Sequence, residues 1–307
     1  MMLSESWIVY NAWWTVNFDG LWKNISKKRR WNPVSATIMT FYNEKGGVGK
    51  TSTTAFVGYN LSKLGYKVLI IDFDPQSNAT QLLLKTASQD GEIITLKQSL
   101  MSAIKQQVPL NDIRLKVREN LYLIPTARDF SLYQRWLDHR FNKEAGKVMS
   151  FASMITSDMR DEYDFIFIDV SPTFSLTNDA AFFACDQMVI MLQTQERSLK
   201  GAEETIAYLQ HNLIDEFGAR IQILGILPVL EKHQAKVDAE ILQIAADEFD
   251  ADNIFSNRIT IMERVKRMDM TGITDRDGWD RRTHTAYRNV ALEIIDRLGM
   301  ELKEQGE

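Results

Sequence analysis

The fold is decided by one stretch near the start of the chain, Lys45-Gly46-Gly47-Val48-Gly49-Lys50-Thr51-Ser52. The apolar run 37–42 before it predicts a strand, and the residues 53–64 after it predict a helix. A strand, a glycine-rich loop and a helix in this order form the setting in which backbone N–H groups cradle phosphates. We therefore expect a nucleotide site here, with Lys50 at the β- and γ-phosphates and the Thr51 hydroxyl on Mg²⁺.

The loop departs from the common pattern G-x-x-x-x-G-K-[ST] at its first position, where Glu44 stands in place of glycine. Gly46, Gly47 and Gly49 remain, and they can adopt backbone angles that other residues avoid. Lys45 adds a second lysine where the phosphates of the same subunit do not need one. The alternative is an ordinary glycine-rich turn with two solvated lysines, and the flanking strand and helix argue against it.

Two further segments place carboxylates at the ends of predicted strands. Asp72 and Asp74 follow the run 67–71, and Asp169 follows the run 165–168. Parallel α/β sheets gather ligand-binding groups at the carboxyl ends of their strands, and carboxylate oxygens suit Mg²⁺. An aspartate at a strand end is more often a turn residue, so each segment is weak by itself. Together with the loop, they predict a site for a nucleotide and Mg²⁺.

From residue 36 onward, short β-rich runs alternate with longer helical patterns, which is typical of βαβ units around a parallel sheet. We predict strands at 37–42, 67–71, 121–124, 165–168, 188–192 and 221–227. We predict helices at 53–64, 145–160, 199–216, 236–249 and 287–302. The expected architecture is a single α/β domain, residues 36–307, with a mostly parallel twisted sheet and helices on both faces.

Two parts of the chain do not follow this alternation. Residues 1–35 hold five of the seven tryptophans and a basic run from Lys27 to Arg30, and we expect a short helical appendage there. That appendage is too short for a helix-turn-helix domain. The segment 257–285 is polar, carries both charges and contains glycines, so we expect it to be a functional loop.

Composition excludes several classes of protein. The net charge of −5 argues against coating nucleic acid with the whole surface, so any DNA contact must be a local patch. The single cysteine, Cys185, allows neither an internal disulfide nor a cysteine-rich metal cluster, which favours a cytoplasmic location. No apolar run approaches the roughly 20 residues that span a bilayer, and we expect no membrane association.

These motifs together resemble the deviant-Walker ATPases of the ParA/MinD type, P-loop NTPases whose loop has the pattern K-G-G-x-G-K-[TS]. The resemblance covers about residues 36 to 300 and rests on three elements in order: Lys45 to Ser52, Asp72 to Thr80, and Ile168-Asp169. The second element resembles the plasmid and chromosome partition branch. The appendage and the segments 271–274 and 278–280 are similar to the delta-type partition ATPases of plasmids from Gram-positive bacteria.

The resemblance implies a role for each matching residue. Lys45 would reach the nucleotide of a partner subunit, and Lys50 would bind phosphate within its own subunit. Thr51 and, through water, Asp169 would serve Mg²⁺, with Asp72 supporting this cluster. Asp74 would place the attacking water. The adenine would lie near Pro228 and its neighbours.

The same resemblance implies an ATPase that dimerises on ATP, binds DNA non-specifically on the nucleoid and works with a ParB-like centromere-binding protein. Non-specific DNA binding requires clustered cations. Our candidates come from the irregular C-terminal segment: Arg258, Arg264, Lys266, Arg267, Arg281 and Arg282. The alternative is an ordinary solvated surface, because acidic residues are interspersed among them.

Three other functions stay open at this point. A MinD-like membrane-associated ATPase would need a basic amphipathic C-terminal helix, whereas the end of this chain is mostly acidic. A synthetase-like enzyme would be stimulated by a small carbon substrate rather than by DNA. A nucleotide-locked structural module would not need Asp74.

Overall fold

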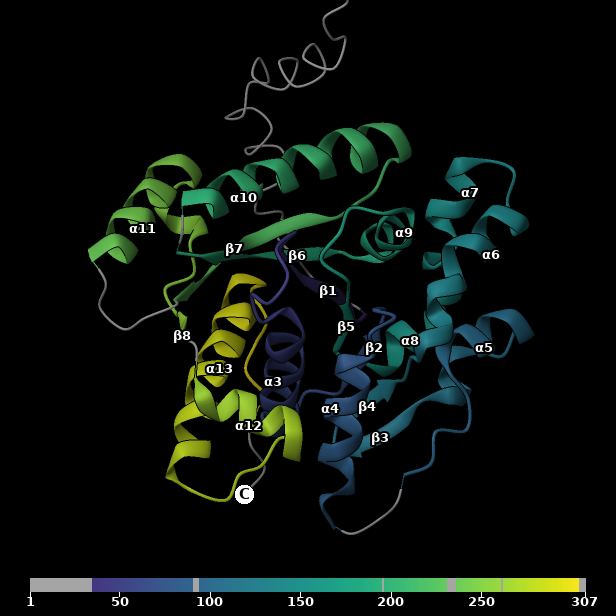
Figure 1. Cartoon of the computed structure of the whole chain (residues 1–307), viewed down its shortest axis with the longest axis horizontal. Coiled ribbons are helices and arrows are strands. Elements are labelled where there is room, and N and C mark those ends of the chain that lie inside the picture. Colours follow the sequence, from purple (N-terminus) through teal and green to yellow (C-terminus); the bar gives the residue numbers. More distant parts are fainter. Residues whose placement is uncertain (1–34, 91–93, 195, 231–235, 261, 304–307) are drawn as a thin grey trace, which may run out of the picture.

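The computed structural model describes residues 35–90, 94–194, 196–230, 236–260 and 262–303. Within these ranges the strands form one sheet in the order β3-β4-β2-β5-β1-β6-β7-β8 (Figure 1). All neighbouring strands are parallel except β3 and β4. The strands are β1 (Thr37–Tyr42), β2 (Val68–Asp72), β3 (Leu115–Arg118), β4 (Leu121–Ile124), β5 (Phe165–Asp169), β6 (Gln187–Gln193), β7 (Gln222–Leu230) and β8 (Ile259–Thr260).

Helices cover both faces of the sheet, and each face has its own apolar core. One face is covered by helices from the two ends of the described chain: α3 (Lys50–Lys63), α4 (Asn78–Ala87), α12 (Glu263–Thr271) and α13 (Gly278–Arg297). The other face is covered by α5 (Leu100–Gln106), α6 (Tyr133–Arg140), α7 (Glu144–Met149), α8 (Ser157–Glu162), α9 (Leu176–Ala184), α10 (Glu196–Tyr208) and α11 (Lys236–Phe249). Helix α10 continues into a π-helical segment, Leu209–Asp215.

The central strands are apolar on both sides because both of their faces are covered. In β5, Ile166 and Ile168 enter one core, whereas Phe165 and Phe167 enter the other. Phe167 stacks on Phe41 of β1, with ring centroids 5.8 Å apart. This alternation fixes the register of β1 against β5, so the carboxyl ends of both strands lie at the same edge of the sheet.

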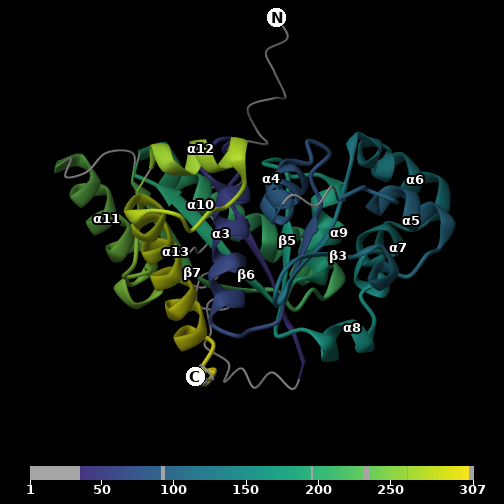
Figure 2. The ribbon, with the colours of Figure 1, turned by 90° about the horizontal axis from the view of Figure 1, so that it is seen from below.

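After the neighbouring strands β1 and β6, the chain continues on opposite faces of the sheet, and this leaves a crevice at the edge of the sheet between them. The chain leaves β1 into α3 on one face, and it leaves the neighbouring β6 into α10 on the other face. Crevices at such points bind ligands in open α/β sheets. Figure 2 shows α12 and α13 beside α3, so the C-terminal helices lie next to this crevice.

The predicted α/β domain with a mostly parallel sheet is confirmed. Each of the six predicted strands is present, with bounds that differ by at most three residues at either end. The single helix predicted at 145–160 is wrong, because the chain forms α7, a 3₁₀ turn (Ala152–Met154) and α8 instead. The Ser150 and Ser153 hydroxyls donate to the carbonyls of Lys147 and Ser150, which competes with a continuous helix.

The prediction of a loop at 257–285 is also wrong, because this segment contains β8, α12 and the beginning of α13. Helix α13 begins at Gly278 rather than at residue 287. Its N-terminus is set by Asp277, whose side chain accepts hydrogen bonds from the backbone N–H groups of Trp279 and Asp280.

Residues 1–34 of the expected N-terminal appendage lie outside the described residues. Among the described helices, none combines the length and the apolar character that crossing a bilayer requires.

Candidate functional site

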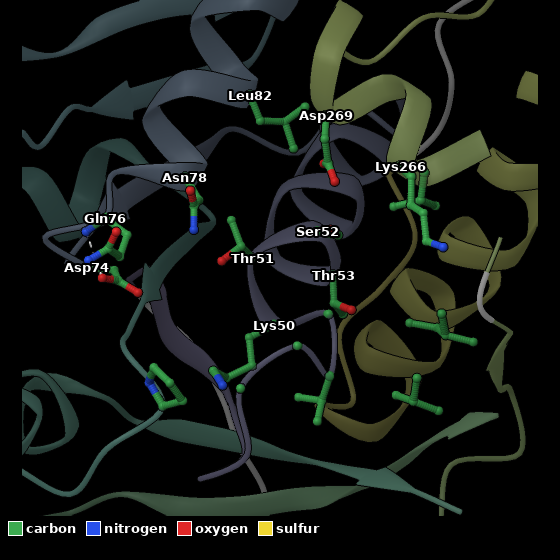
Figure 3. Close-up of a pocket in the computed structure, with 18 of the residues that line it drawn as sticks. Lys50, Thr51, Ser52, Thr53, Asp74, Gln76, Asn78, Leu82, Lys266 and Asp269 are labelled. Carbon is green, nitrogen blue, oxygen red and sulfur yellow. Dashed lines mark hydrogen bonds between the residues drawn. The ribbon is translucent and has the colours of Figure 1, made fainter. Parts of the chain in front are cut away.

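A cavity of about 700 Å³ lies at the carboxyl edge of the sheet, over the N-terminus of α3 (Figure 3). The glycine-rich loop and the beginning of α3 form its floor. One side comes from the ends of β2 and β5 and from α4, and the other side comes from β7, β8, α12 and α13. The structure therefore brings the loop, Asp74 and the C-terminal segment, which are far apart in sequence, around one space.

The loop has the backbone that its glycines predict. Gly47 and Gly49 have φ angles of 78° and 89°, which residues with a side chain rarely adopt. Gly49 directly precedes α3 and has no side chain to cap the helix, so the first N–H groups of α3 lie open at the cavity. A helix N-terminus of this kind attracts anions.

Lys50 is buried at the floor of the cavity. Its Nζ donates to the carbonyl oxygens of Asn43, at 2.9 Å, and Lys45, at 3.1 Å. Burial lowers the pKa of Lys50 to about 8, although the nearby Asp169 and Asp74 partly oppose this effect. A bound phosphate would add negative charge beside this amine and favour its charged form.

Asp72 and Asp169 are register partners on the adjacent strands β2 and β5, and both are fully buried. The Asp72 carboxylate accepts hydrogen bonds from the backbone N–H and hydroxyl of Thr80 and from the backbone N–H of Asp74. Burial raises the pKa of Asp72 to about 7, although the bonds from Thr80 lower it in part. Asp72 thus anchors the beginning of α4 and the Asp74 turn, so its geometry fits a supporting role better than direct metal ligation.

Asp169 differs because neither of its carboxylate oxygens has a well-formed hydrogen bond. Burial and then the charge of Asp72 raise its pKa, whereas the adjacent Thr51 hydroxyl favours the charged form. A buried carboxylate without partners is costly unless a cation or water compensates it. Among the described residues, no three His, Cys, Asp or Glu side chains lie close enough together to bind a metal ion by themselves. The oxygen donors of Asp169 and Thr51 fit Mg²⁺ that also takes water and phosphate oxygens.

Asp74 lies at the cavity wall in a tight turn. Its Oδ1 accepts from the backbone N–H of Gln76 at 2.9 Å, and its carbonyl accepts from Ser77, whose φ is 53°. Figure 3 shows Thr51 and Lys50 pointing from α3 toward the side on which Asp74 lies. The arrangement can hold a phosphate chain, with a carboxylate beside its outer end.

Beyond α3, the other end of the cavity is mainly apolar. Its wall includes Val229 of β7, Ile259 of β8, and Met262 and Val265 beside or on α12. The Thr53 hydroxyl is buried without a hydrogen-bond partner and points toward this side in Figure 3. Pro228 is buried within β7, opposite Leu192, and its neighbour Val229 lines the cavity.

This apolar wall and several polar supports were not predicted from the sequence. Ile259 lies on β8, Met262 immediately precedes α12 and Val265 lies on α12, so no single periodicity indicates this wall. Asn178 was also missed: it is fully buried, and its amide donates to the carbonyls of Ser171 and Thr173. These bonds fix the turn that follows Asp169 and that carries Pro172, which also lines the cavity. No spacing pattern in the sequence indicates the contacts of Asn178.

The six basic residues proposed for DNA lie in different surroundings. Arg264 is largely enclosed, and its guanidinium contacts Asp280 at 2.5 Å and Asp277 at 2.7 Å. Lys266 lies at the rim of the cavity and contacts Glu263. The other four are exposed: Arg258, Arg267, Arg281 and Arg282. The structure therefore separates Arg264, which holds α12 against α13, from the cations that face solvent.

Comparisons with known proteins found a matching family, relatives and solved structures. The sequence model described as "AAA domain" matches residues 36–223. The chain is 25% identical over 266 residues to the chromosome-partitioning ATPase Soj of Treponema pallidum, a match that covers 85% of this chain and 98% of the relative.

Two solved structures share the fold. A variant of McdA from Cyanothece in complex with ATP superposes with a TM-score of 0.71 at 23% identity, covering 88% of this chain and 99% of that one. Cobyrinic acid a,c-diamide synthase from Mycobacterium smegmatis, with a bound ATP analogue and magnesium, has a TM-score of 0.65 at 22% identity, covering 87% and 98%. At such identities the likeness concerns the fold alone.

Proposed function

The chain belongs to the AAA-domain family and is a P-loop ATPase of the ParA/MinD type, and on this premise we propose that it segregates DNA through an ATP-dependent dimer. In this proposal the dimer encloses Mg²⁺-ATP, binds DNA without sequence preference and responds to a ParB-like centromere-binding protein. Hydrolysis then separates the subunits. The protein would act in the cytoplasm, on the nucleoid.

The observation that carries the proposal is the different placement of the two loop lysines. Lys50 is buried below the phosphate position, whereas Lys45 is exposed at the loop's outer side. One buried lysine would already serve the phosphates of its own subunit. A second, exposed lysine on the same loop suits a nucleotide that a second copy presents, so that ATP holds the two copies together.

The chemistry assigned to the site follows from its geometry. Phosphoryl transfer depends mainly on positioning and charge neutralisation. Lys50 and the N–H groups of α3 would hold the phosphates, and Asp169 and Thr51 would hold Mg²⁺, which neutralises phosphate charge. Asp74, at the wall beside the outer phosphate, would orient the attacking water. The apolar end at Val229 and Ile259 would take the base.

The proposed DNA contact uses the exposed cations of the C-terminal segment. Arg267 lies on α12, Arg281 and Arg282 lie on α13, and Arg258 immediately precedes β8. Helix α12 also contributes to the cavity wall. Nucleotide and DNA would therefore contact the same short helix from different sides, and this supports a DNA affinity that depends on ATP.

The test measures mass and DNA binding with each nucleotide. We expect ATP with Mg²⁺, and not ADP, to shift the protein from monomer to dimer in sedimentation velocity and to produce co-sedimentation with arbitrary duplex DNA. Lys50→Ala is the control that should show neither effect. Unchanged mass and unchanged DNA binding with ATP would contradict the proposal. Stimulation of turnover by a small carboxylic acid, and not by DNA, would favour the synthetase-like alternative.

A further inference from the structure

Lys45 is held against its own subunit in this structure. Its Nζ donates a hydrogen bond to Oε1 of Gln193, with 2.6 Å between the two atoms. Gln193 is the last residue of β6 and only 6% exposed, so its amide is fixed by the strand and its surroundings. The lysine side chain therefore lies toward the end of β6 in the single subunit rather than extending freely into solvent.

The backbone of Lys45 is tied to the same strand. Asn43 accepts a hydrogen bond from the backbone N–H of Lys45 at 2.7 Å and donates one to the carbonyl of Met191 at 2.6 Å. Met191 and Gln193 are two residues apart on β6, so their side chains lie on the same side of the sheet. The Lys45 amine thus bonds directly to β6, and its backbone N–H is linked to β6 through the side chain of Asn43.

We propose that Gln193 retains Lys45 in the monomer and thereby sets the ATP concentration at which two copies associate; the proposal rests on the proposed function. The amine occupies one position at a time, so it must leave Gln193 before it contacts the nucleotide of a second copy. A ligand shifts an equilibrium only by its difference in affinity for the two states. The bond to Gln193 stabilises the monomer, so a higher ATP concentration is needed before the dimer predominates.

Two substitutions of Gln193 should act in opposite directions. Gln193→Met keeps the length of the side chain but removes the acceptor, and we expect half-maximal dimerisation at a roughly fivefold lower ATP concentration. Gln193→Glu strengthens the hold on the charged amine and should raise that concentration by roughly fivefold. A residue that only supports the sheet would not give opposite shifts.

The matched control is Gln187→Met, at the other end of β6. Gln187 is also a nearly buried glutamine, 4% exposed, but it lies at the amino end of the strand, away from the loop. Its substitution removes an amide from the same strand without touching Lys45. We expect dimerisation at the wild-type ATP concentration, provided that thermal unfolding shows the variant to be folded.

A second measurement tests whether Gln193 holds Lys45, and it does not require the dimer. The rate at which an acylating reagent modifies Lys45 is followed by mass spectrometry in nucleotide-free protein, with Lys116, an exposed lysine on β3, as the internal standard. We expect faster modification of Lys45 in Gln193→Met and slower modification in Gln193→Glu. Equal rates in all variants would overturn the inference.

The two measurements separate this inference from the proposed function. If the wild-type protein does not dimerise with ATP, the proposed function fails, and the modification rates still decide whether Gln193 holds Lys45. If Gln193→Met and Gln193→Glu both weaken dimerisation, Gln193 supports the active position of Lys45 and the inference is overturned.

Discussion

The two ends of the cavity are built by different means. The phosphate end comes from a loop and strand ends whose shape depends on local sequence, namely the loop glycines and the aspartates that follow β2 and β5. The opposite wall comes from β8, α12 and α13, which depend on contacts with α3 and α4. Substitutions at the first end should therefore change chemistry, whereas substitutions at the second should change stability and the width of the cavity.

The largest expected effect lies at the phosphate end. Asp74→Ala should lower ATP turnover by about 100-fold, because removing one group that stabilises or positions the reacting atoms typically costs this much. ATP binding should persist, so the dimer should accumulate on DNA. A phosphate-release assay and DNA co-sedimentation measure the two effects. Normal hydrolysis by this variant would remove Asp74 from the mechanism.

The next effect concerns the contact between α12 and α4. Gly272 ends α12 with a φ of 83°, and a Cβ there would lie 2.7 Å from backbone atoms of Lys85 and Thr86. We expect Gly272→Ala to lower the free energy of unfolding by about 3 kcal/mol, from backbone strain together with the forced separation of the two helices. Urea unfolding measures the change.

The matched control for this substitution is Gly218→Ala. Gly218 also has a positive φ, 69°, but a Cβ there meets nothing within 4 Å. Gly218→Ala should lower the free energy of unfolding by about 1 kcal/mol, from backbone strain alone. Equal losses in the two variants would show that the α12–α4 contact does not limit stability, and the proposed difference between the two ends would weaken.

A smaller effect is expected where α12 meets α13. Burial by itself raises the pKa of Asp280, but hydrogen bonds from Arg264, from the backbone N–H of Arg276 and from Thr274 lower it to about 2. A lowered pKa in the folded state stabilises the protein above the ordinary value near 3.8, and this stability is lost as the pH falls toward 2.

Asp280→Asn should therefore lower the melting temperature at neutral pH by about 3 °C. The difference from the wild type should shrink between pH 4 and pH 2, where the native carboxylate becomes protonated. Calorimetry across this range checks both statements. A constant difference at every pH would show that the charge of Asp280 is not what stabilises the junction.

The smallest effect is expected at the solvent-facing cations. Replacing Arg281 and Arg282 together by Ala should weaken DNA binding by roughly tenfold and reduce the slope of its salt dependence, because each phosphate contact adds about 0.9 to that slope. Arg135→Ala, at an exposed position on α6, is the control. Unchanged affinity and slope would remove this pair from the proposed DNA surface, while ATP turnover should stay normal.

The sequence was sufficient for the parts of the fold that depend on local pattern. The central strands are continuous apolar runs, and the glycines of the loop allow backbone angles that other residues avoid, so both could be predicted. Helix α12 could not, because Met268 is its only fully buried hydrophobic residue among those described. Its position depends instead on contacts such as that of the Lys85 amine with the carbonyl of Asp269.

The site shows the same division. Lys45, Lys50, Asp74 and Asp169 could be named from motifs, and all four lie at or just after the carboxyl ends of β1, β2 and β5, at one edge of the sheet. Asn43 and Gln193 could not, because each acts through a residue about 150 positions away, and nothing in their own surroundings in the sequence indicates it.

Helices α3, α4, α12 and α13 cover the same face of the sheet, but they are not synthesised together on the ribosome. Helices α3 and α4 are synthesised before α12 and α13, which complete the same core. Until they arrive, the side of α3 that packs against α13 has no cover, and the cavity lacks one of its walls. Chains that expose such surfaces during synthesis are clients for chaperones. A nascent chain therefore gains its full nucleotide site only once α13 has been released from the exit tunnel.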